Sequence, residues 1–176
     1  MGLDVTAYSK LSKIDDVKYL DGDVYDKTLT VVAPEAYDLV VYVSRDFPGR
    51  EEGLEDRGVY QAEESFGFRA GSYGGYNDFR EELAKLAGYP SVPGDSERHN
   101  HSRGAWAAKG GLFWELIKFS DCDGTIGPVV SKKLSEDFRT FDADAQTHGD
   151  AWFYQRYQEW KKAFELAADD GAVSFQ

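Results

Sequence analysis

The chain has 176 residues, of which 32 are acidic and 20 basic, so its formal charge at pH 7 is −12. A surface of this sign repels phosphate backbones and anionic lipids, which argues against direct binding of nucleic acid or of a membrane. Hydrophobic residues make up 41% and aromatic residues 15% of the chain, enough to build a self-sufficient core. We therefore expect one folded domain over residues 1–176.

Composition also bears on the compartment and on the class of partner. Cys122 is the only cysteine, so no internal disulfide can form and a reducing compartment is expected. The first residues carry an acid at Asp4 and lack the basic and long apolar regions of a secretory signal. These features predict a cytoplasmic protein, and the negative charge favours a partner protein with a basic surface. The oligomeric state stays open.

The first half of the chain has the residue patterns of β-strands. Near the start, Leu3, Val5 and Ala7 alternate with polar residues, the period of a half-buried strand. Residues 28–33 and 38–44 are β-branched runs separated by four residues, which is typical of a hairpin. We expect this hairpin at the centre of an antiparallel sheet. Residues 45–58 contain a proline, three glycines and many charges, which predicts an exposed loop.

From residue 76 onward the apolar residues recur every three or four positions, which indicates helices. The apolar stripes are Tyr76, Phe79, Leu83 and Leu86; Leu112, Phe113, Leu116 and Ile117; Val130, Leu134, Phe138 and Phe141; and Phe153, Tyr157, Trp160 and Phe164. Between the first two stripes, residues 89–110 are rich in proline, glycine and polar residues, and predict a long loop or mobile flap.

Residues 172–175 follow the last stripe and are a candidate terminal strand. The expected fold is therefore α+β. An antiparallel sheet from the N-terminal half, joined by the candidate C-terminal strand, packs against about four helices from residues 75–169.

One short string resembles an enzyme signature. Residues 121–126 read Asp-Cys-Asp-Gly-Thr-Ile, which resembles the string that opens the active site of haloacid-dehalogenase-type phosphatases. The resemblance implies that Asp121 attacks phosphorus, Asp123 handles the leaving-group proton and a magnesium ion offsets the charge. Such a nucleophile ends the first strand of a parallel sheet and is followed by several βα units. Only fifty residues follow, and they predict two helices and a strand. No catalytic residue is therefore predicted. In the alternative interpretation, in which the chain is a phosphatase, the catalytic residues are Asp121 and Asp123.

The same string has the outline of an EF-hand calcium loop. With Gly124 as the turn glycine, Asp121 and Asp123 fall at two ligand positions, but the first and twelfth positions are apolar and the bidentate carboxylate is absent. No cofactor is expected, and a divalent cation at these two carboxylates is the weaker alternative. The favoured interpretation is a turn that joins two helices. In it both acids accept local hydrogen bonds, Gly124 supplies an unusual dihedral and Pro128 begins the next helix.

A glycine-rich segment precedes the first predicted helix. Residues 68–76 read Phe-Arg-Ala-Gly-Ser-Tyr-Gly-Gly-Tyr, and backbone N–H groups at the start of a helix attract anions. Neither the P-loop spacing nor GxGxxG is present. The expected ligand is a phosphate or a small nucleotide-like molecule. The predicted ligand-binding residues are Arg69, Ser72, Tyr73, Gly74 and Gly75.

Several separated segments together resemble a group of bacterial, prophage and phage proteins. They are the opening Met-Gly-Leu-Asp-Val and residues 71–88, 111–124 and 164–175. In that group the acidic loop is often preceded by histidine and the chain often ends in histidine, where this chain has Phe119 and Gln176. The group has no established reaction. The resemblance implies a phage or prophage accessory protein, a setting in which small acidic proteins often bind host components, including defence systems.

Together these features predict a non-enzymatic binding protein. Its expected role is to inhibit a host protein or defence system, or to sequester a nucleotide-like signal, in the cytoplasm of the host cell. Two alternatives stay open. One is a metal-assisted phosphoester hydrolase that uses Asp121 and Asp123, and the other is a structural or assembly protein.

Overall fold

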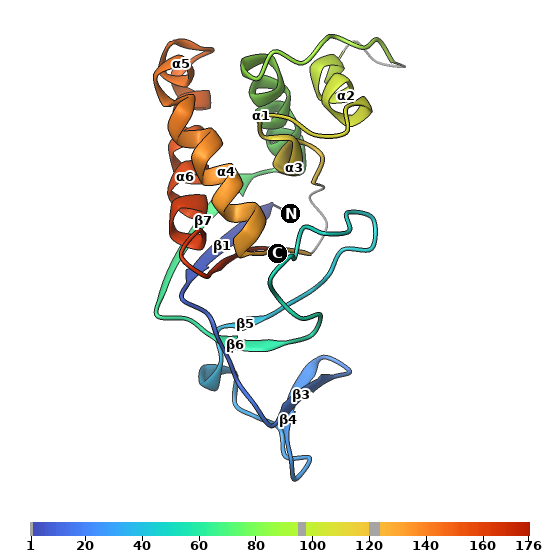
Figure 1. The fold of residues 1–176 in the computed structure, drawn as a ribbon, viewed down its shortest axis with the longest axis vertical. Coiled ribbons are helices and arrows are strands. Elements are labelled where there is room, and N and C mark those ends of the chain that lie inside the picture. Colours follow the sequence, from blue (N-terminus) through green and yellow to red (C-terminus); the bar gives the residue numbers. More distant parts are fainter. Residues whose placement is uncertain (1, 95–97, 120–123) are drawn as a thin grey trace.

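A layer of helices covers one face of a four-stranded sheet, and a smaller β-region extends from the opposite face (Figure 1). This computed structural model describes residues 2–94, 98–119 and 124–176. The strand order is β7-β1-β9-β8 and every pairing in it is antiparallel. The four strands are β1 (Leu3–Ser9), β7 (Glu64–Gly71), β8 (Gly124–Ile126) and β9 (Ala172–Phe175). The α+β expectation is confirmed.

Strands from the two ends of the chain form the middle of this sheet. In β1, Leu3, Val5 and Ala7 are buried in the core, as their alternation predicts. β1 pairs with β9, so that Val5 lies opposite Phe175. The candidate C-terminal strand is therefore a central element of the sheet.

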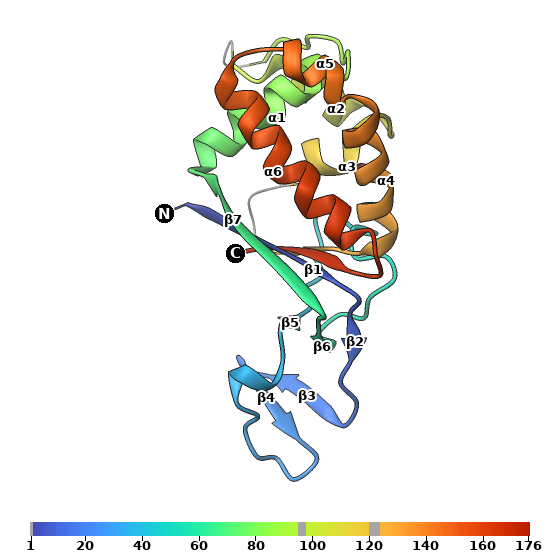
Figure 2. The same ribbon diagram turned by 90° about the vertical axis from the view of Figure 1, so that its left-hand side faces the viewer.

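The helical layer follows the apolar stripes. Its elements are α1 (Tyr73–Leu86), α2 (Asn100–Ala107), α3 (Trp114–Ile117), α4 (Pro128–Thr140), α5 (Asp142–Thr147) and α6 (Ala151–Ala167). α6 crosses β1 and packs along α4 (Figure 2). Its predicted stripe is fully buried, and Trp160 lies at the centre, with ring centroids 5.1 Å from Phe68, 6.0 Å from Phe79 and 5.5 Å from Phe175. Pro128 begins α4, as expected.

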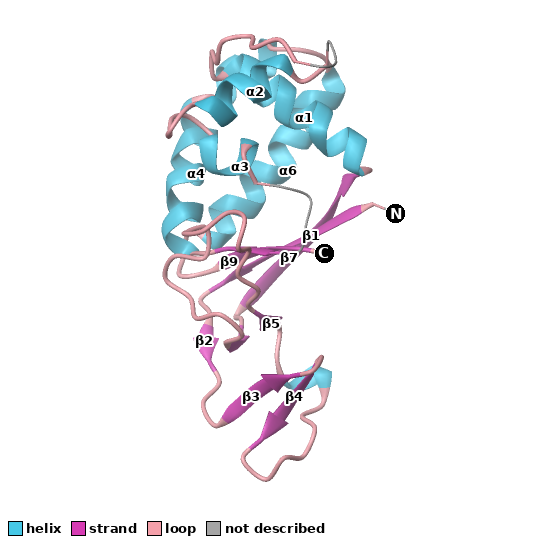
Figure 3. Cartoon of the chain, turned by 90° about the vertical axis from the view of Figure 1, so that its right-hand side faces the viewer, coloured by secondary structure: helices cyan, strands magenta, loops and turns pink. Residues whose placement is uncertain are grey.

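The smaller β-region lies below the other face of the sheet. β2 (Ser12–Lys13), β5 (Leu39–Val40) and β6 (Val59–Gln61) form a three-stranded sheet. β3 (Val17–Leu20) and β4 (Asp23–Asp26) form a hairpin that stands away from the helices (Figure 3). Two hydrogen bonds between Tyr42 and Thr125 of β8, at 3.0 and 3.2 Å, and a small buried cluster join this region to the central sheet. The members of the cluster are Tyr8, Leu39, Val41, Tyr60 and Ala172.

The predicted hairpin of residues 28–33 and 38–44 is wrong. Residues 28–33 form no strand, and Val31 makes a single bridge to Tyr25. The cause is local, because Asp26 Oδ1 accepts hydrogen bonds from the Thr28 and Thr30 backbone N–H groups, at 2.8 and 3.0 Å. The hydrogen bonds from Thr30 and Thr28 lower the pKa of Asp26. The turn thus takes the backbone groups that a ladder would have used.

Both predicted loops contain residues that the fold buries. Residues 89–110 include α2, whose first N–H groups are held by a carboxylate of α1, so the prediction of one long loop or flap is wrong there. Residues 45–58 lie outside helices and strands, as expected. Arg50 within them is only 6% exposed, and its Nε donates to Glu115 O at 3.1 Å. Its guanidinium lies 4.6 Å from the Trp114 ring centroid.

Candidate functional site

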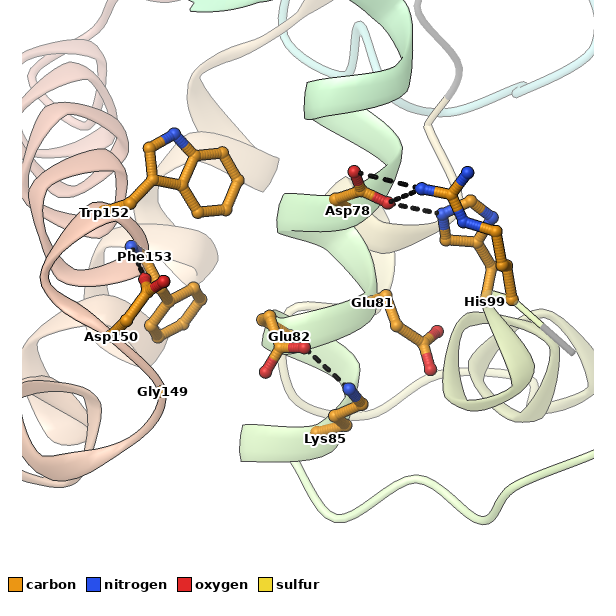
Figure 4. Close-up of a pocket in the computed structure, with 10 residues that line it drawn as sticks. Asp78, Glu81, Glu82, Lys85, His99, Gly149, Asp150, Trp152 and Phe153 are labelled. Atoms are coloured by element: carbon orange, nitrogen blue, oxygen red, sulfur yellow. Dashed lines mark hydrogen bonds and ion pairs between the residues drawn. The ribbon is translucent and has the colours of Figure 1, made fainter.

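A cleft of about 620 Å³ lies between α1, the start of α2 and the start of α6 (Figure 4). It lies at the end of the helical layer, away from the β3–β4 hairpin. Its polar and indole side chains are Asp78, Glu81, Glu82, Lys85, Arg98, His99, Asp150 and Trp152. Four of them are carboxylates, whereas only Lys85 and Arg98 carry permanent positive charge, so the cleft is acidic.

Two carboxylates of α1 form one wall. Asp78 and Glu82 are four residues apart and therefore lie on the same face of the helix. Asp78 Oδ1 is 3.1 Å from Arg98 Nη2 and 3.0 Å from His99 Nε2. Glu82 Oε1 is 2.6 Å from Lys85 Nζ. Glu82 Oε2 also lies 3.3 Å from His148 Nε2, and the His99 and His148 side chains are each only 26% exposed, so both acids already have partners within the cleft.

Glu81 has a different, structural role. It is 8% exposed, and its carboxylate accepts hydrogen bonds from the His101 N–H at 3.0 Å and from the Ser102 N–H at 2.8 Å. The Ser102 hydroxyl donates a third bond at 2.9 Å. Burial alone raises the pKa of Glu81, but the hydrogen bonds from Ser102 and His101 outweigh it and lower the pKa. Glu81 thereby fixes α2, and with it His99, against α1.

The start of α6 forms the opposite wall. Asp150 caps the helix, because its Oδ1 accepts a hydrogen bond from the Phe153 N–H at 3.0 Å. Trp152, in the first turn, lies outside the apolar stripe of α6 and is 37% exposed, whereas the stripe itself is buried. Figure 4 shows its indole on the α6 side of the cleft and Glu82 on the flank of α1 nearer to it, whereas the Asp78 carboxylate is directed toward His99. The site therefore combines an exposed aromatic ring with facing carboxylates.

At the predicted anion site, at the start of α1, one backbone N–H group is already hydrogen-bonded within the chain. Ser72 is the N-cap, and its Oγ accepts a hydrogen bond from the Gly75 N–H at 3.1 Å. Tyr73 is 40% exposed, and Gly74 continues the same first turn. Arg69 lies before the turn, at the end of β7, and its carbonyl accepts a bond from Arg156. None of the five predicted ligand residues lines the α1–α6 cleft.

Asp121, Cys122 and Asp123 lie outside the described residues, so their predicted roles stay predictions. The part of the string that is described differs from a turn between helices, because residues 124–126 form β8. Gly124 begins this strand directly after the residues that are not described, so the expectation of an unusual dihedral there stays a prediction. Its role is steric, since a Cβ there would lie 2.8 Å from Phe119 Cζ.

Sequence reasoning missed the cleft residues for identifiable reasons. Asp78 and Glu82 have the i, i+4 spacing of any solvated helix face, and Trp152 does not belong to the apolar stripe of α6. His99 was placed in a loop. The sequence does place an aromatic residue, Trp152, outside the apolar stripe at the start of a helix. Its acidic neighbours come from α1, and they approach it only because α6 packs against α1.

Comparison with known proteins adds no assignment. No protein-family model, no curated protein and no solved structure matches the chain significantly. In the parts of the chain that the structure describes, no cluster of three or more His, Cys, Asp or Glu side chains is arranged to hold a metal ion. None of the described helices combines the length and the apolar character that a membrane span requires.

Proposed function

We propose that this protein is a non-enzymatic binding protein whose α1–α6 cleft receives an arginine or lysine side chain of a partner protein. The observation that carries the proposal is the pairing of the exposed Trp152 ring with the Asp78 and Glu82 carboxylates across one cleft. A cation placed there is attracted by the face of the indole and forms charge-assisted hydrogen bonds with the acids.

The resident cations of the cleft leave room for such a ligand. The Arg98 side chain is 72% exposed and Lys85 is 40% exposed. Exposed ion pairs of this kind contribute only about 0–1 kcal/mol each. An incoming guanidinium that also stacks on Trp152 therefore gains more than the displaced ion pair loses. The charge of −12 adds long-range attraction for a basic partner.

The cleft also discriminates between the two kinds of ligand expected from the sequence. Four carboxylates line it, and they repel the phosphate groups of a nucleotide. We therefore propose a protein with a basic surface, and not a nucleotide, as the ligand of this cleft. The phage or prophage setting, the inhibition of a host defence protein and the cytoplasmic location belong to the same proposal and rest on the sequence resemblance and on composition.

Binding of short arginine peptides tests the proposal. Calorimetric titration with an acetylated hexa-arginine peptide should show about five- to thirtyfold weaker binding for Trp152→Ala, since a cation–π contact is worth about 1–2 kcal/mol. Glu82→Gln should weaken binding by a similar factor.

Glu35→Gln is the matched control, because it removes the same charge from an exposed site in the η1 turn (Pro34–Ala36), far from the cleft. It should change binding less than twofold. Equal losses for Trp152→Ala, Glu82→Gln and Glu35→Gln would show that the peptide follows net charge alone, and the cleft would not be the binding site.

A further inference from the structure

The outer edge of β7 is an unpaired strand edge. β7 pairs with β1 on one side and is the last strand of the sheet. In Figure 2 it lies in front of β1, and no other strand or loop is drawn across it. It is eight residues long and contains no proline. Folded proteins usually cover, charge or interrupt such an edge, because its free N–H and C=O groups pair readily with another strand.

The hydrogen-bond register identifies the outward-facing groups. Asp4 exchanges both of its backbone bonds with Gln176, at 3.0 and 2.8 Å, so Asp4 points toward β9. In an antiparallel ladder successive residues point alternately to the two neighbours. Val5 and Ala7 therefore bond to Phe68 and Phe66 of β7. The residues that alternate with Phe66 and Phe68, which are Ser65, Gly67 and Arg69, therefore direct their backbone groups away from the sheet.

A hydrogen bond to α6 agrees with this register. The Arg69 carbonyl accepts a hydrogen bond of 2.7 Å from Arg156 Nη1 of α6, so it faces outward. Within the described residues, no other backbone partner is recorded for Ser65, Gly67 or Arg69 on this side. The edge thus has two residues, Ser65 and Gly67, whose backbone groups are open to a further strand.

Gly67 is not explained by the fold of a single chain. It has no positive φ, and a Cβ there would meet its nearest atom, Thr6 Oγ1, at 3.8 Å, an ordinary contact. Glycine in the interior of a strand weakens that strand, and it often marks a place where another backbone approaches closely. Gly67 lies near the middle of the open edge.

The two ends of this edge carry opposite charges, so the edge of one copy is complementary to the antiparallel edge of a second copy. Glu64 begins β7, and Arg69 lies near its end, where Arg156 joins it from α6. Within the chain, Glu63 is paired with Lys10 at 2.8 Å and Arg156 with Glu159 at 2.7 Å, which leaves Glu64 as the acid open to a second copy. When two copies of such a strand pair antiparallel, the acidic end of each lies beside the basic end of the other. A partner of uniform charge would oppose one of the two ends.

We infer that β7 pairs antiparallel with β7 of a second copy of this chain and forms a continuous eight-stranded sheet. The twofold axis passes beside Gly67, so that Ser65 lies opposite Arg69 of the second copy, and the Cα atoms of these hydrogen-bonded pairs are about 5.5 Å apart. Phe66 then faces Phe68 of the second copy, an aromatic cross-strand pair. In the dimer, the Arg156 side chain releases the Arg69 carbonyl of its own chain and forms an ion pair with Glu64 of the second copy.

Analytical ultracentrifugation at about 0.15 M salt tests the inference, because the repulsion between two acidic chains is screened beyond about 8 Å there. A reversible dimer should appear between ~1 and ~200 µM protein. Gly67→Pro removes an outward N–H without touching the bonds to β1, and it should raise the dissociation constant at least about tenfold.

Gly67→Lys is a second variant, which places a charge on the edge without constraining the backbone. It should also abolish the dimer, and its thermal melting at low concentration checks that the monomer still folds. A protein that is monomeric at every concentration, or a dimer that is unchanged in both variants, would overturn the inference.

A mixing experiment tests the register and symmetry. Glu64→Arg places two arginines together in each of the two equivalent contacts, and Arg156→Glu places two acids together, so each variant alone should be monomeric. In a 1:1 mixture both contacts again join an acid and a base, and a heterodimer should form. No dimer in the mixture would contradict the antiparallel arrangement.

Discussion

The two faces of the central sheet are packed in different ways. The face toward the helices is covered by a continuous aromatic core, in which Trp160, Tyr76 and Phe175 are almost completely buried. The opposite face is covered by a much smaller cluster around Tyr60 and Leu39, beyond which the β3–β4 hairpin extends. Because stability follows buried apolar contact, the helical side should open only with the whole protein, whereas the β-region should open at a lower free energy.

The largest expected effect is on the helical side. Trp160→Ala should lower the free energy of unfolding by about 3–5 kcal/mol, since it leaves a cavity in the aromatic core. The matched substitution on the other face is Tyr60→Ala, which removes a side chain that is 6% exposed in the smaller cluster. Its cost should be about 1–2 kcal/mol. Urea denaturation followed by circular dichroism compares them, and equal costs would refute the contrast between the faces.

A second test concerns the attachment of α2 to the helical side. Glu81→Gln removes the charge from three hydrogen bonds and should cost about 2 kcal/mol at pH 7. The pKa of Glu81 is lowered in the folded state, so its stabilisation is present above the unfolded value of about 4.3 and is lost as the pH falls through the folded value. Urea denaturation between pH 7 and 3 should therefore show a smaller loss in Glu81→Gln than in the wild type. Parallel curves would contradict this linkage.

The smallest expected effect lies in the β-region. The Tyr42 hydroxyl donates to the Tyr19 hydroxyl at 2.6 Å, and the two rings pack edge to face. Tyr19→Phe should cost only about 0.5–1 kcal/mol, because the bond is exposed. Hydrogen exchange should become faster in β3 and β4 and stay unchanged in α6. Faster exchange in α6 would show that the two regions unfold together.

Residues with a regular local pattern were predicted well. The stripe of α6 and the alternation in β1 are buried as expected, and the stripes of α1 and α4 are buried except for their last residues, Leu86 and Phe141, which are partly buried. The period of the apolar residues alone determines which side of such an element can be buried. β7 was missed although Phe66 and Phe68 alternate with small residues. Its two glycines and its charged start made it resemble a loop.

The candidate site depended on contacts that no local pattern contains. Trp152 and Glu82 are seventy residues apart in the sequence and meet only because α6 packs beside α1. The same holds for α2, whose polar sequence has no apolar stripe and whose start is held by Glu81. The hairpin predicted for residues 28–33 and 38–44 failed because the Thr28 and Thr30 N–H groups bond to the Asp26 side chain and the Val32 N–H bonds to Val24 of β4.

By itself the sequence determined the charge of −12, the α+β class and the buried faces of the long helices, because these depend on composition and on the spacing of apolar residues. Only the tertiary structure decided that the two terminal strands share one sheet, that β7 is left at its edge and that an acidic cleft faces Trp152. These features are long-range contacts, and their energy comes from surfaces that meet only after the chain has folded.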